Sequence, residues 1–202
     1  MRRKYLIIIL SLSLLFNTLL LPLLVNEYLR FTYSQTLAHW RSKFIPPNSV
    51  FLGDSITAGG RGFNRSGDIN RGSNGLLTYQ IAAGITAAEI YSPRHIVVTA
   101  GTNDAIKGRI DVAEHKALWP KICADPKVII TLAPPTAILE LNQRLAQVNQ
   151  IARGACKGHP IISLDTLRGS DGLIQSRYTV DGVHLSAPAY VIWRSLLAEK
   201  GV

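Results

Sequence analysis

Cysteine, methionine and charged residues are scarce in this chain of 202 residues, which has 2 cysteines, 1 methionine and 17% charged residues. Two cysteines are too few for a small scaffold held together by disulfides. The chain is 47% hydrophobic, so it can bury a core, and wholesale disorder is excluded. At roughly 100–200 residues per domain, the length accommodates one globular domain and an additional segment.

Acidic residues are also few, since 13 Asp and Glu stand against 22 Lys and Arg and the formal net charge is +9. A basic excess can indicate nucleic-acid binding. Here it includes no run of five or more like charges, no zinc-finger spacing and no basic helix with interleaved aromatic residues. We therefore expect no nucleic-acid partner.

Motifs of common metal and nucleotide sites are missing as well. The sequence has no H-E-x-x-H, no cluster of Cys and His, no P-loop and no complete G-x-G-x-x-G. We therefore expect a protein that needs neither a metal ion nor a cofactor.

Charge is absent from residues 5–25, an apolar stretch that follows Arg2, Arg3 and Lys4. As a helix it would be about 30 Å long, which matches the hydrocarbon core of a bilayer and exceeds the usual signal-peptide region of about 7–15 residues. No A-x-A-like cleavage triplet follows it, and it contains no cysteine for lipidation. We expect an uncleaved transmembrane helix within residues 1–27, with a cleaved signal segment or a buried core helix as alternatives.

Positive charge ahead of such a span favours a cytoplasmic N-terminus and places the rest of the chain across the membrane. We therefore expect an extracytoplasmic domain, on the periplasmic or extracellular face, or a secreted one if the segment is cleaved. Residues 28–47, which include Trp40 and Phe44 and end in Pro46 and Pro47, are expected to form a juxtamembrane linker or helix.

Beyond this linker, short apolar runs alternate with segments of helical spacing. The strand candidates are Val50–Leu52, the surroundings of Ile69, Ile96–Ala100, Val128–Leu132 and Ile161–Leu164. The helix candidates are Leu76–Tyr91, Asp111–Ile122, Thr136–Arg153 and Ser186–Glu199, the third of which has Leu141, Leu145, Val148 and Ile151 on one stripe. The alternation predicts a doubly wound α/β domain over 48–202, with a central, mostly parallel five-stranded sheet between two layers of helices.

The two cysteines, Cys123 and Cys156, each lie just ahead of an apolar run. If Val128–Leu132 and Ile161–Leu164 are neighbouring parallel strands, both thiols lie at the same sheet edge, and outside the cytoplasm they can oxidise. We expect a disulfide between them, and two separate buried thiols are the alternative.

Ligands of such a sheet bind beyond the carboxyl ends of its strands, so the residues there are the candidates for chemistry. Gly53–Thr57 places a serine at a strand-to-helix turn, Asn70–Gly75 offers backbone N–H groups, and Gly101–Asp104 offers an amide. Asp181–His184 places a carboxylate three residues before an imidazole, where it can fix the tautomer and stabilise the protonated ring.

With these four segments in this order, the sequence resembles the SGNH hydrolase family, also called GDSL esterases and lipases, over about residues 48–200. The resemblance implies a flavodoxin-like three-layer fold and catalysis by a serine nucleophile, without metal. It assigns the roles of nucleophile, oxyanion donors and acid–base pair by position: Ser55 as nucleophile and donor, Gly75 and Asn103 as further donors, and Asp181 with His184 as the pair that activates the serine. Asp54 and Asp104 are interpreted as structural.

Two departures from the family pattern lie early in the domain. Only 15 residues separate Ser55 from Asn70, so the intervening helix and strand are expected to be trimmed. After Gly75 the common Asp-Thr is replaced by Leu76-Leu77, which makes Gly72 a competing oxyanion donor.

The implied activity is hydrolysis of carboxylic esters through an acyl-enzyme. We expect small acyl groups, acetyl above all, on carbohydrate or envelope substrates, because the chain is compact and has no long apolar insertion to line an acyl channel. The alternatives are a lysophospholipase or thioesterase acting on lipid acyl groups, an acyltransferase, and a non-catalytic tethered binding protein. Arg61, Arg65 and Arg71 either favour an anionic substrate or form an ordinary solvated loop.

Overall fold

The computed structural model describes residues 36–37, 40–108 and 110–202. Residues 46–202 form one compact unit, and the few described residues before Pro46 do not belong to it. The predicted transmembrane helix lies outside the described residues. Within the part of the chain that is described, no helix has the length and apolar character needed to cross a membrane.

A five-stranded sheet in the order β2-β1-β3-β4-β5 forms the centre of the larger unit. All four neighbouring pairs are parallel. The strands are β1 (Ser49–Gly53), β2 (Ile69–Asn70), β3 (His95–Thr99), β4 (Val128–Thr131) and β5 (Ile161–Ile162). Each lies at a predicted strand, so the predicted five-stranded parallel sheet is confirmed.

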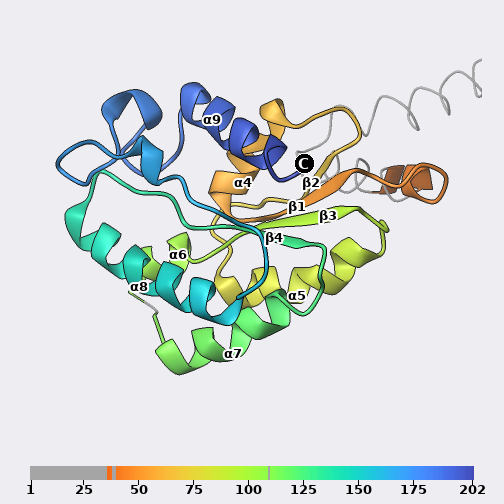
Figure 1. Cartoon of the computed structure of the whole chain (residues 1–202), viewed down its shortest axis with the longest axis horizontal. Helices are drawn as coiled ribbons and strands as arrows, with labels where there is room; N and C mark the ends of the chain where they lie inside the picture. The colour runs from red at the N-terminus through yellow and green to blue at the C-terminus, as the bar shows by residue number, and fades with distance from the viewer. Residues whose placement is uncertain (1–35, 38–39, 109) are drawn as a thin grey trace, which may run out of the picture. The chain divides into compact units, whose positions relative to one another are not determined.

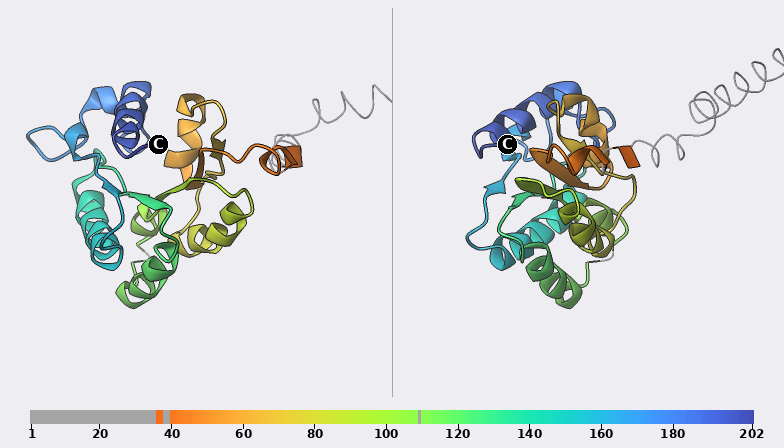
Figure 2. Two further views of the ribbon diagram at one scale, coloured as in Figure 1. Left: turned by 45° about the vertical axis from the view of Figure 1, so that its right-hand side comes forward. Right: turned by 90° about the vertical axis from the view of Figure 1, so that its right-hand side faces the viewer.

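Helices cover both faces of this sheet, as predicted. Figure 1 shows α4 and α9 on one face and α5, α6, α7 and α8 on the other, and the further views in Figure 2 agree. The α-helices are α4 (Ser55–Gly59), α5 (Thr78–Glu89), α6 (Thr102–Ile106), α7 (Val112–Ile122), α8 (Leu139–Ala155) and α9 (Ala187–Ala198). Short 3-10 turns are η1 (Gly60–Phe63), η2 (Asp165–Leu167) and η3 (Ser176–Tyr178).

The core beneath α9 follows from the alternation of side chains along the strands. Phe51 of β1, Val97 of β3 and Ile129 of β4 belong to one buried cluster together with Trp193 of α9. The Trp193 ring meets the Phe51 ring edge-on at 6.1 Å between centroids, and its Nε1–H donates to the Thr131 hydroxyl at 3.0 Å. This packing fixes α9, which follows the Asp181–His184 segment, against the sheet.

The largest departures from the predicted helices are the start of α8 and the presence of α6, whereas α5, α7 and α9 lie within two residues of their predicted bounds. α8 begins at Leu139 rather than Thr136, because the Asn142 side chain accepts from the Thr136 N–H and donates to its carbonyl, both at 2.8 Å, and so holds that turn out of the helix. α6 was not predicted, since its five residues are too short to show a helical period. α4 also has five residues, in line with the trimmed segment expected after Ser55.

A disulfide joins Cys123 and Cys156, whose Cα atoms are 5.5 Å apart. The two residues are the C-caps of α7 and α8. β4 and β5, which follow them, are neighbouring parallel strands. The disulfide therefore fastens the C-terminal ends of two helices on the same face of the sheet.

The order of strands reverses direction at β1 and β3, since the chain moves from β1 outward to β2 and then returns to β3 on the other side. Loops that leave the carboxyl ends of these two strands diverge to opposite faces, and ligands of doubly wound sheets bind in the resulting crevice. Ser55 follows β1 and Asn103 follows β3, so both predicted residues lie at this position.

Candidate active site

Ser55 is the first residue of α4, directly after β1. Asp54 caps this helix by accepting the Ile56 N–H at 2.9 Å. The turn needs a glycine before Asp54, because a Cβ on Gly53 would lie 2.6 Å from the backbone oxygen of Thr99. The sequence Gly-Asp-Ser therefore sets the serine at the helix start with a half-buried side chain.

His184 joins Ser55 to Asp181 through both of its ring nitrogens. Its Nε2 lies 3.0 Å from Ser55 Oγ, and its Nδ1 lies 2.6 Å from Asp181 Oδ2. Ser55 and His184 are 129 residues apart in sequence. The structure thus brings the three residues predicted for the triad into one hydrogen-bonded line.

A tight turn shapes the segment that carries His184. The Thr179 hydroxyl donates to the His184 carbonyl at 2.8 Å and accepts the Gly182 N–H at 2.8 Å. Gly182 has φ of +89°, a backbone conformation that favours glycine. The Gly182 carbonyl in turn accepts the Ala137 N–H at 2.7 Å, which ties the turn to the loop before α8.

The Asp181 carboxylate is held ionised. Its Oδ1 accepts the backbone N–H groups of His184, at 2.7 Å, and Val183, at 2.9 Å. These bonds and the His184 ring lower the pKa of Asp181 to about 2, with the His184 N–H as the largest cause. The side chains of His184 and Asp181 are 43% and 51% exposed, so the pair is open to solvent and to a substrate.

Asp54 lies in the opposite environment. Its side chain is fully buried, and burial raises the pKa of its carboxyl to about 6, although the bond from Ile56 N–H opposes the shift. Its Oδ2 has no hydrogen-bond partner within the described residues. Its observed contact is a helix cap, which agrees with the structural role expected for it.

Asn103 is oriented by the loop after β2. Its Nδ2 donates one hydrogen to the Leu76 carbonyl at 3.0 Å, and the amide has a second hydrogen to donate. The next residue, Asp104, accepts both the N–H and the hydroxyl of Thr78 at the start of α5, at 3.0 and 2.9 Å, and lies 3.6 Å from the buried His115. Sequence reasoning missed this network, because the key acceptor is a leucine carbonyl, which leaves no side-chain signal.

Gly72 and Gly75 are the two candidates for an oxyanion donor, and the N–H of Gly72 is already used in a hydrogen bond within the protein. This N–H donates to Asn70 Oδ1 at 2.9 Å, and a Cβ added to Gly72 would lie 2.7 Å from the backbone carbon of Thr57 in α4. Gly75 is exposed, has φ of +77° and donates its N–H to no other described residue. The geometry therefore favours Gly75 over Gly72 as a candidate N–H donor to an oxyanion.

The arginines between the first two motifs act within the protein. Arg61 donates to the Gly72 carbonyl at 2.6 Å, and Arg71 donates to the Tyr91 hydroxyl at 2.7 Å while lying over its ring. These two bonds attach Arg61 and Arg71 to neighbouring segments, and Arg61 and Arg65 are exposed to solvent.

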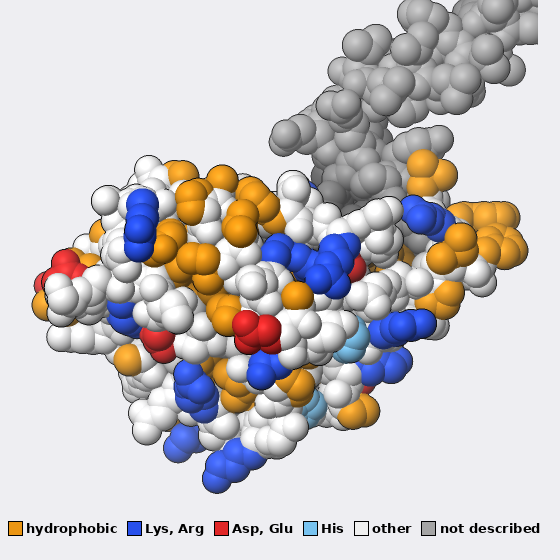
Figure 3. Space-filling model, turned by 45° about the horizontal axis from the view of Figure 1, so that its top comes forward, with side chains coloured by type: hydrophobic (Ala, Val, Ile, Leu, Met, Phe, Trp, Pro, Cys, Tyr) orange, Lys and Arg blue, Asp and Glu red, His pale blue; other side chains and the backbone are white. Residues whose placement is uncertain are grey.

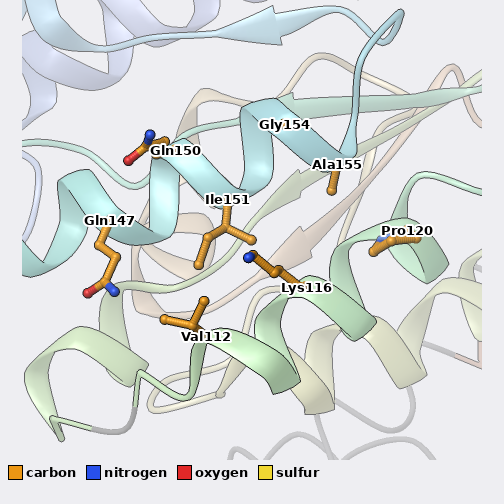
Figure 4. A pocket seen from close by; sticks show the side chains of 8 residues that line it. All are labelled: Val112, Lys116, Pro120, Gln147, Gln150, Ile151, Gly154 and Ala155. Carbon is orange, nitrogen blue, oxygen red and sulfur yellow. The ribbon is translucent and has the colours of Figure 1, made fainter.

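A pocket of about 560 Å³ lies between α7 and α8, and none of the predicted site residues lines it. Figure 4 shows Ile151 and Val112 facing each other across it with Lys116 and Gln147 nearby. Ile151, which was predicted on the apolar stripe of α8, lines this pocket and is half-buried.

On the face of the molecule in Figure 3, Lys and Arg side chains are dispersed among hydrophobic, acidic and uncharged ones.

Comparison with known proteins agrees with this geometry. One similar solved structure is a GDSL-like lipase from Bacteroides thetaiotaomicron, with 25% identity, a TM-score of 0.64, and coverage of 76% of this chain and 88% of that one. Others are a lipolytic G-D-S-L protein from Veillonella parvula (22% identity, TM-score 0.60, 75% and 96% covered) and a variant of an acetyl-xylooligosaccharide esterase from Geobacillus (16%, 0.57, 75% and 92%).

No curated protein matches the chain. A family profile, however, matches residues 51–192, which is more than half of the chain and spans every predicted site residue. The chain is therefore a member of the GDSL-like lipase/acylhydrolase family, and its chemistry is that of a GDSL-type ester hydrolase.

Proposed function

We propose that this protein is a membrane-anchored serine esterase that removes small acyl groups, acetyl above all, from carbohydrate or envelope substrates outside the cytoplasm. The observation that carries the catalytic part is the line of hydrogen bonds from Ser55 Oγ through His184 to Asp181, at 3.0 and 2.6 Å. A serine, a base and an orienting carboxylate within hydrogen-bond reach are the signature of an activated nucleophile.

In the first step, Ser55 Oγ attacks the ester carbonyl and His184 Nε2 takes the hydroxyl proton. Asp181 accepts the Nδ1–H, so it fixes the tautomer that leaves Nε2 free to act as a base and it stabilises the imidazolium that forms. The low pKa of Asp181 keeps this carboxylate charged throughout the reaction.

The negative charge that develops on the carbonyl oxygen is stabilised by the N–H of Ser55, the N–H of Gly75 and the side-chain amide of Asn103. These donors come from the carboxyl ends of β1, β2 and β3, which are adjacent in the sheet. His184 then protonates the leaving alkoxide, and an acyl-enzyme remains on Ser55. Water, activated by the same imidazole, releases the acid and restores the serine.

Three observations support small acyl groups on an extracytoplasmic substrate. The helix after Ser55 has only five residues, and the pocket between α7 and α8 contains no site residue, so neither provides an acyl channel beside the serine. One protein of the same fold is an acetyl-xylooligosaccharide esterase. The uncharged stretch 5–25 behind a basic cluster supports the membrane location.

A second candidate, hydrolysis of longer lipid acyl groups, is favoured by apolar side chains near the catalytic turn. Val180, next to Asp181, is 71% exposed, and Ile138 and Leu139 are 45% and 55% exposed. The bond from Ala137 N–H to the Gly182 carbonyl places these two segments side by side. An acyl chain of several carbons can contact this apolar rim, whereas an acetyl group is too short to use it.

Hydrolysis of p-nitrophenyl acetate, butyrate and octanoate by the full chain tests the proposal. We expect kcat/KM to fall as the acyl chain lengthens and to vanish in Ser55→Ala. Ser73→Ala is the matched control, because this exposed serine lies in the loop after β2 and only its backbone N–H is bonded to the nucleophile turn.

A higher kcat/KM for octanoate than for acetate would favour hydrolysis of lipid acyl groups instead. That preference should then disappear in the double variant Val180→Ser with Ile138→Ser. Transfer of the acyl group to an added sugar without release of free acid would identify an acyltransferase. Absence of any Ser55-dependent turnover would contradict the esterase proposal and favour a binding protein.

A further inference from the structure

Several large apolar side chains are exposed in the sequence just before the unit formed by residues 46–202. Residues 40–42 are helical, and Trp40 and Phe44 are four residues apart, which places their side chains on one side of this turn. Leu37 is also exposed. Trp40 is 61% exposed, Phe44 76% and Ile45 62%. The Trp40 and Phe44 rings contact each other, with centroids 6.5 Å apart.

Two cationic side chains, those of Arg41 and Lys43, lie between these apolar residues in sequence. The Lys43 ammonium is 5.8 Å from the centre of the Trp40 ring. The sequence from residue 28 to residue 53 contains no Asp or Glu and includes Arg30 as a third cation. Exposed aromatic residues next to cations that have no acidic neighbours in sequence suit the interface of an anionic membrane.

We infer that Trp40, Arg41, Lys43, Phe44 and Ile45 form an interfacial surface that binds the headgroup region of an anionic phospholipid bilayer. The inference rests on the proposed membrane anchoring and adds a second contact with the same membrane. Trp40 and Phe44 insert at headgroup level, and the two cations pair with lipid phosphates.

A bilayer is a better partner for this surface than another protein, because the surface follows closely in sequence on the apolar stretch 5–25. The uncharged stretch ends at Val25, so 15 residues lead to Trp40. Even fully extended, this connection spans at most about 50 Å, so an anchored chain holds the surface near the membrane at high local concentration. The contact then adds stability to the anchor without having to recruit the protein by itself.

Quenching of the tryptophan fluorescence of the full chain reports mainly on Trp40, because the other two tryptophans are shielded from quenchers. Trp119 and Trp193 are 1% and 2% exposed, whereas Trp40 is largely exposed. The protein is incorporated into vesicles of phosphatidylcholine and phosphatidylglycerol and recovered by flotation. Emission is then measured with lipids brominated near the headgroup or deep in the chains, and the signal of Trp40→Phe is subtracted.

We expect the Trp40 emission to shift to the blue, to be quenched most by the shallow bromines, and to be shielded from aqueous acrylamide. Phe44→Ser with Ile45→Ser should restore acrylamide quenching. Arg41→Gln with Lys43→Gln should lower the ratio of docked to undocked segment on phosphatidylglycerol by on the order of tenfold, and should have little effect on pure phosphatidylcholine.

Several results would overturn the inference. Protein that floats with the vesicles while Trp40 remains fully accessible to acrylamide would show an anchor without this surface. Shielding of Trp40 that needs no lipid and grows with protein concentration would indicate a second copy of the chain as the partner. Failure to float would reject both anchor and surface, and the hydrolysis of p-nitrophenyl acetate by the same sample would show separately whether the esterase proposal holds.

Discussion

Two carboxyl groups lie near Ser55: Asp54 precedes it in sequence, and Asp181 contacts His184 beside it. Their environments shift their pKa values in opposite directions. Asp181 is exposed and accepts two backbone N–H groups, which lower its pKa to about 2, whereas burial raises the pKa of Asp54 to about 6. The Asp181 carboxyl therefore remains an anion beside His184 at neutral and mildly acidic pH. The Asp54 carboxyl titrates in the mildly acidic range, and its protonation changes stability.

Asp54→Asn should remove that pH dependence. Because the folded-state pKa of Asp54 is about 6 and the reference value is 3.8, the folded protein holds a proton that the unfolded chain releases between these values. The stability of the parent therefore falls as pH rises from about 4 to about 6, by up to about 3 kcal/mol.

An asparagine keeps the oxygen that accepts the Ile56 N–H and cannot ionise. The free energy of unfolding in urea, measured at pH 4 and pH 7, should then fall more for the parent than for Asp54→Asn. Titrating groups that do not interact with Asp54, Asp181 among them, contribute equally to both proteins. Equal changes in the two proteins would show that Asp54 does not titrate in this range.

In the proposed mechanism, Asn103 supplies a side-chain donor to the oxyanion. In Asn103→Ala we expect kcat for p-nitrophenyl acetate to fall by about 10²–10³-fold, the usual effect of losing one oxyanion donor. The lost bond to the Leu76 carbonyl should cost only about 1 kcal/mol of stability.

Asn74→Ala is the control, since this exposed amide lies in the loop beside Gly75 and has no assigned role. Thermal unfolding distinguishes a misfolded variant from an inactive one. A kcat that stays within the range of the control would remove Asn103 from the oxyanion site.

At the scale of elements, the strands were predictable because four of the five include a short run of Val, Ile, Leu or Phe, and β1, β3 and β4 are almost entirely buried. The longer helices were also predictable: α5, α7 and α9 start within one or two residues of the predicted positions, and α8 starts three residues later than predicted. The first turn expected for α8 is replaced by bonds between Thr136 and Asn142, which are six residues apart and have no periodic signature. α6 is shorter than two helical turns, so no apolar stripe can reveal it.

The disulfide links two of these elements and should contribute strongly to stability. Cys123 and Cys156 are separated by 33 residues, and a closed loop of that length corresponds to about 3–4 kcal/mol of lost chain entropy in the unfolded state. We expect Cys123→Ser with Cys156→Ser to lower the midpoint of urea unfolding while leaving kcat/KM unchanged, because none of the residues predicted for the triad or for the oxyanion site lies in α7 or α8.

The same lowering should appear when the parent is unfolded in the presence of a reductant, and the double variant should not respond to it. Equal midpoints for oxidised and reduced parent would contradict a stabilising role of the bond.

At the scale of the whole molecule, the site depends on segments that are distant in sequence. Motif order alone named Ser55, Asn103, Asp181 and His184, but the contacts that align them had to come from the structure. The Leu76 carbonyl orients Asn103, and the Ala137 N–H holds the turn before His184. Both are backbone groups of residues whose side chains carry no polar signal, so sequence patterns could not identify them.

These segments all belong to the unit formed by residues 46–202, and this gives the last prediction. A chain that starts at Pro46 should fold and should hydrolyse p-nitrophenyl acetate with the kcat/KM of the full chain, because every bond described in the site lies within this unit. It should also lose flotation with vesicles, since the uncharged stretch and the interfacial surface are both absent from it. A shortened chain that is folded by circular dichroism but inactive would show that residues before Pro46 contribute to the active site. One that is active and still floats would place a membrane-binding surface on the catalytic unit itself.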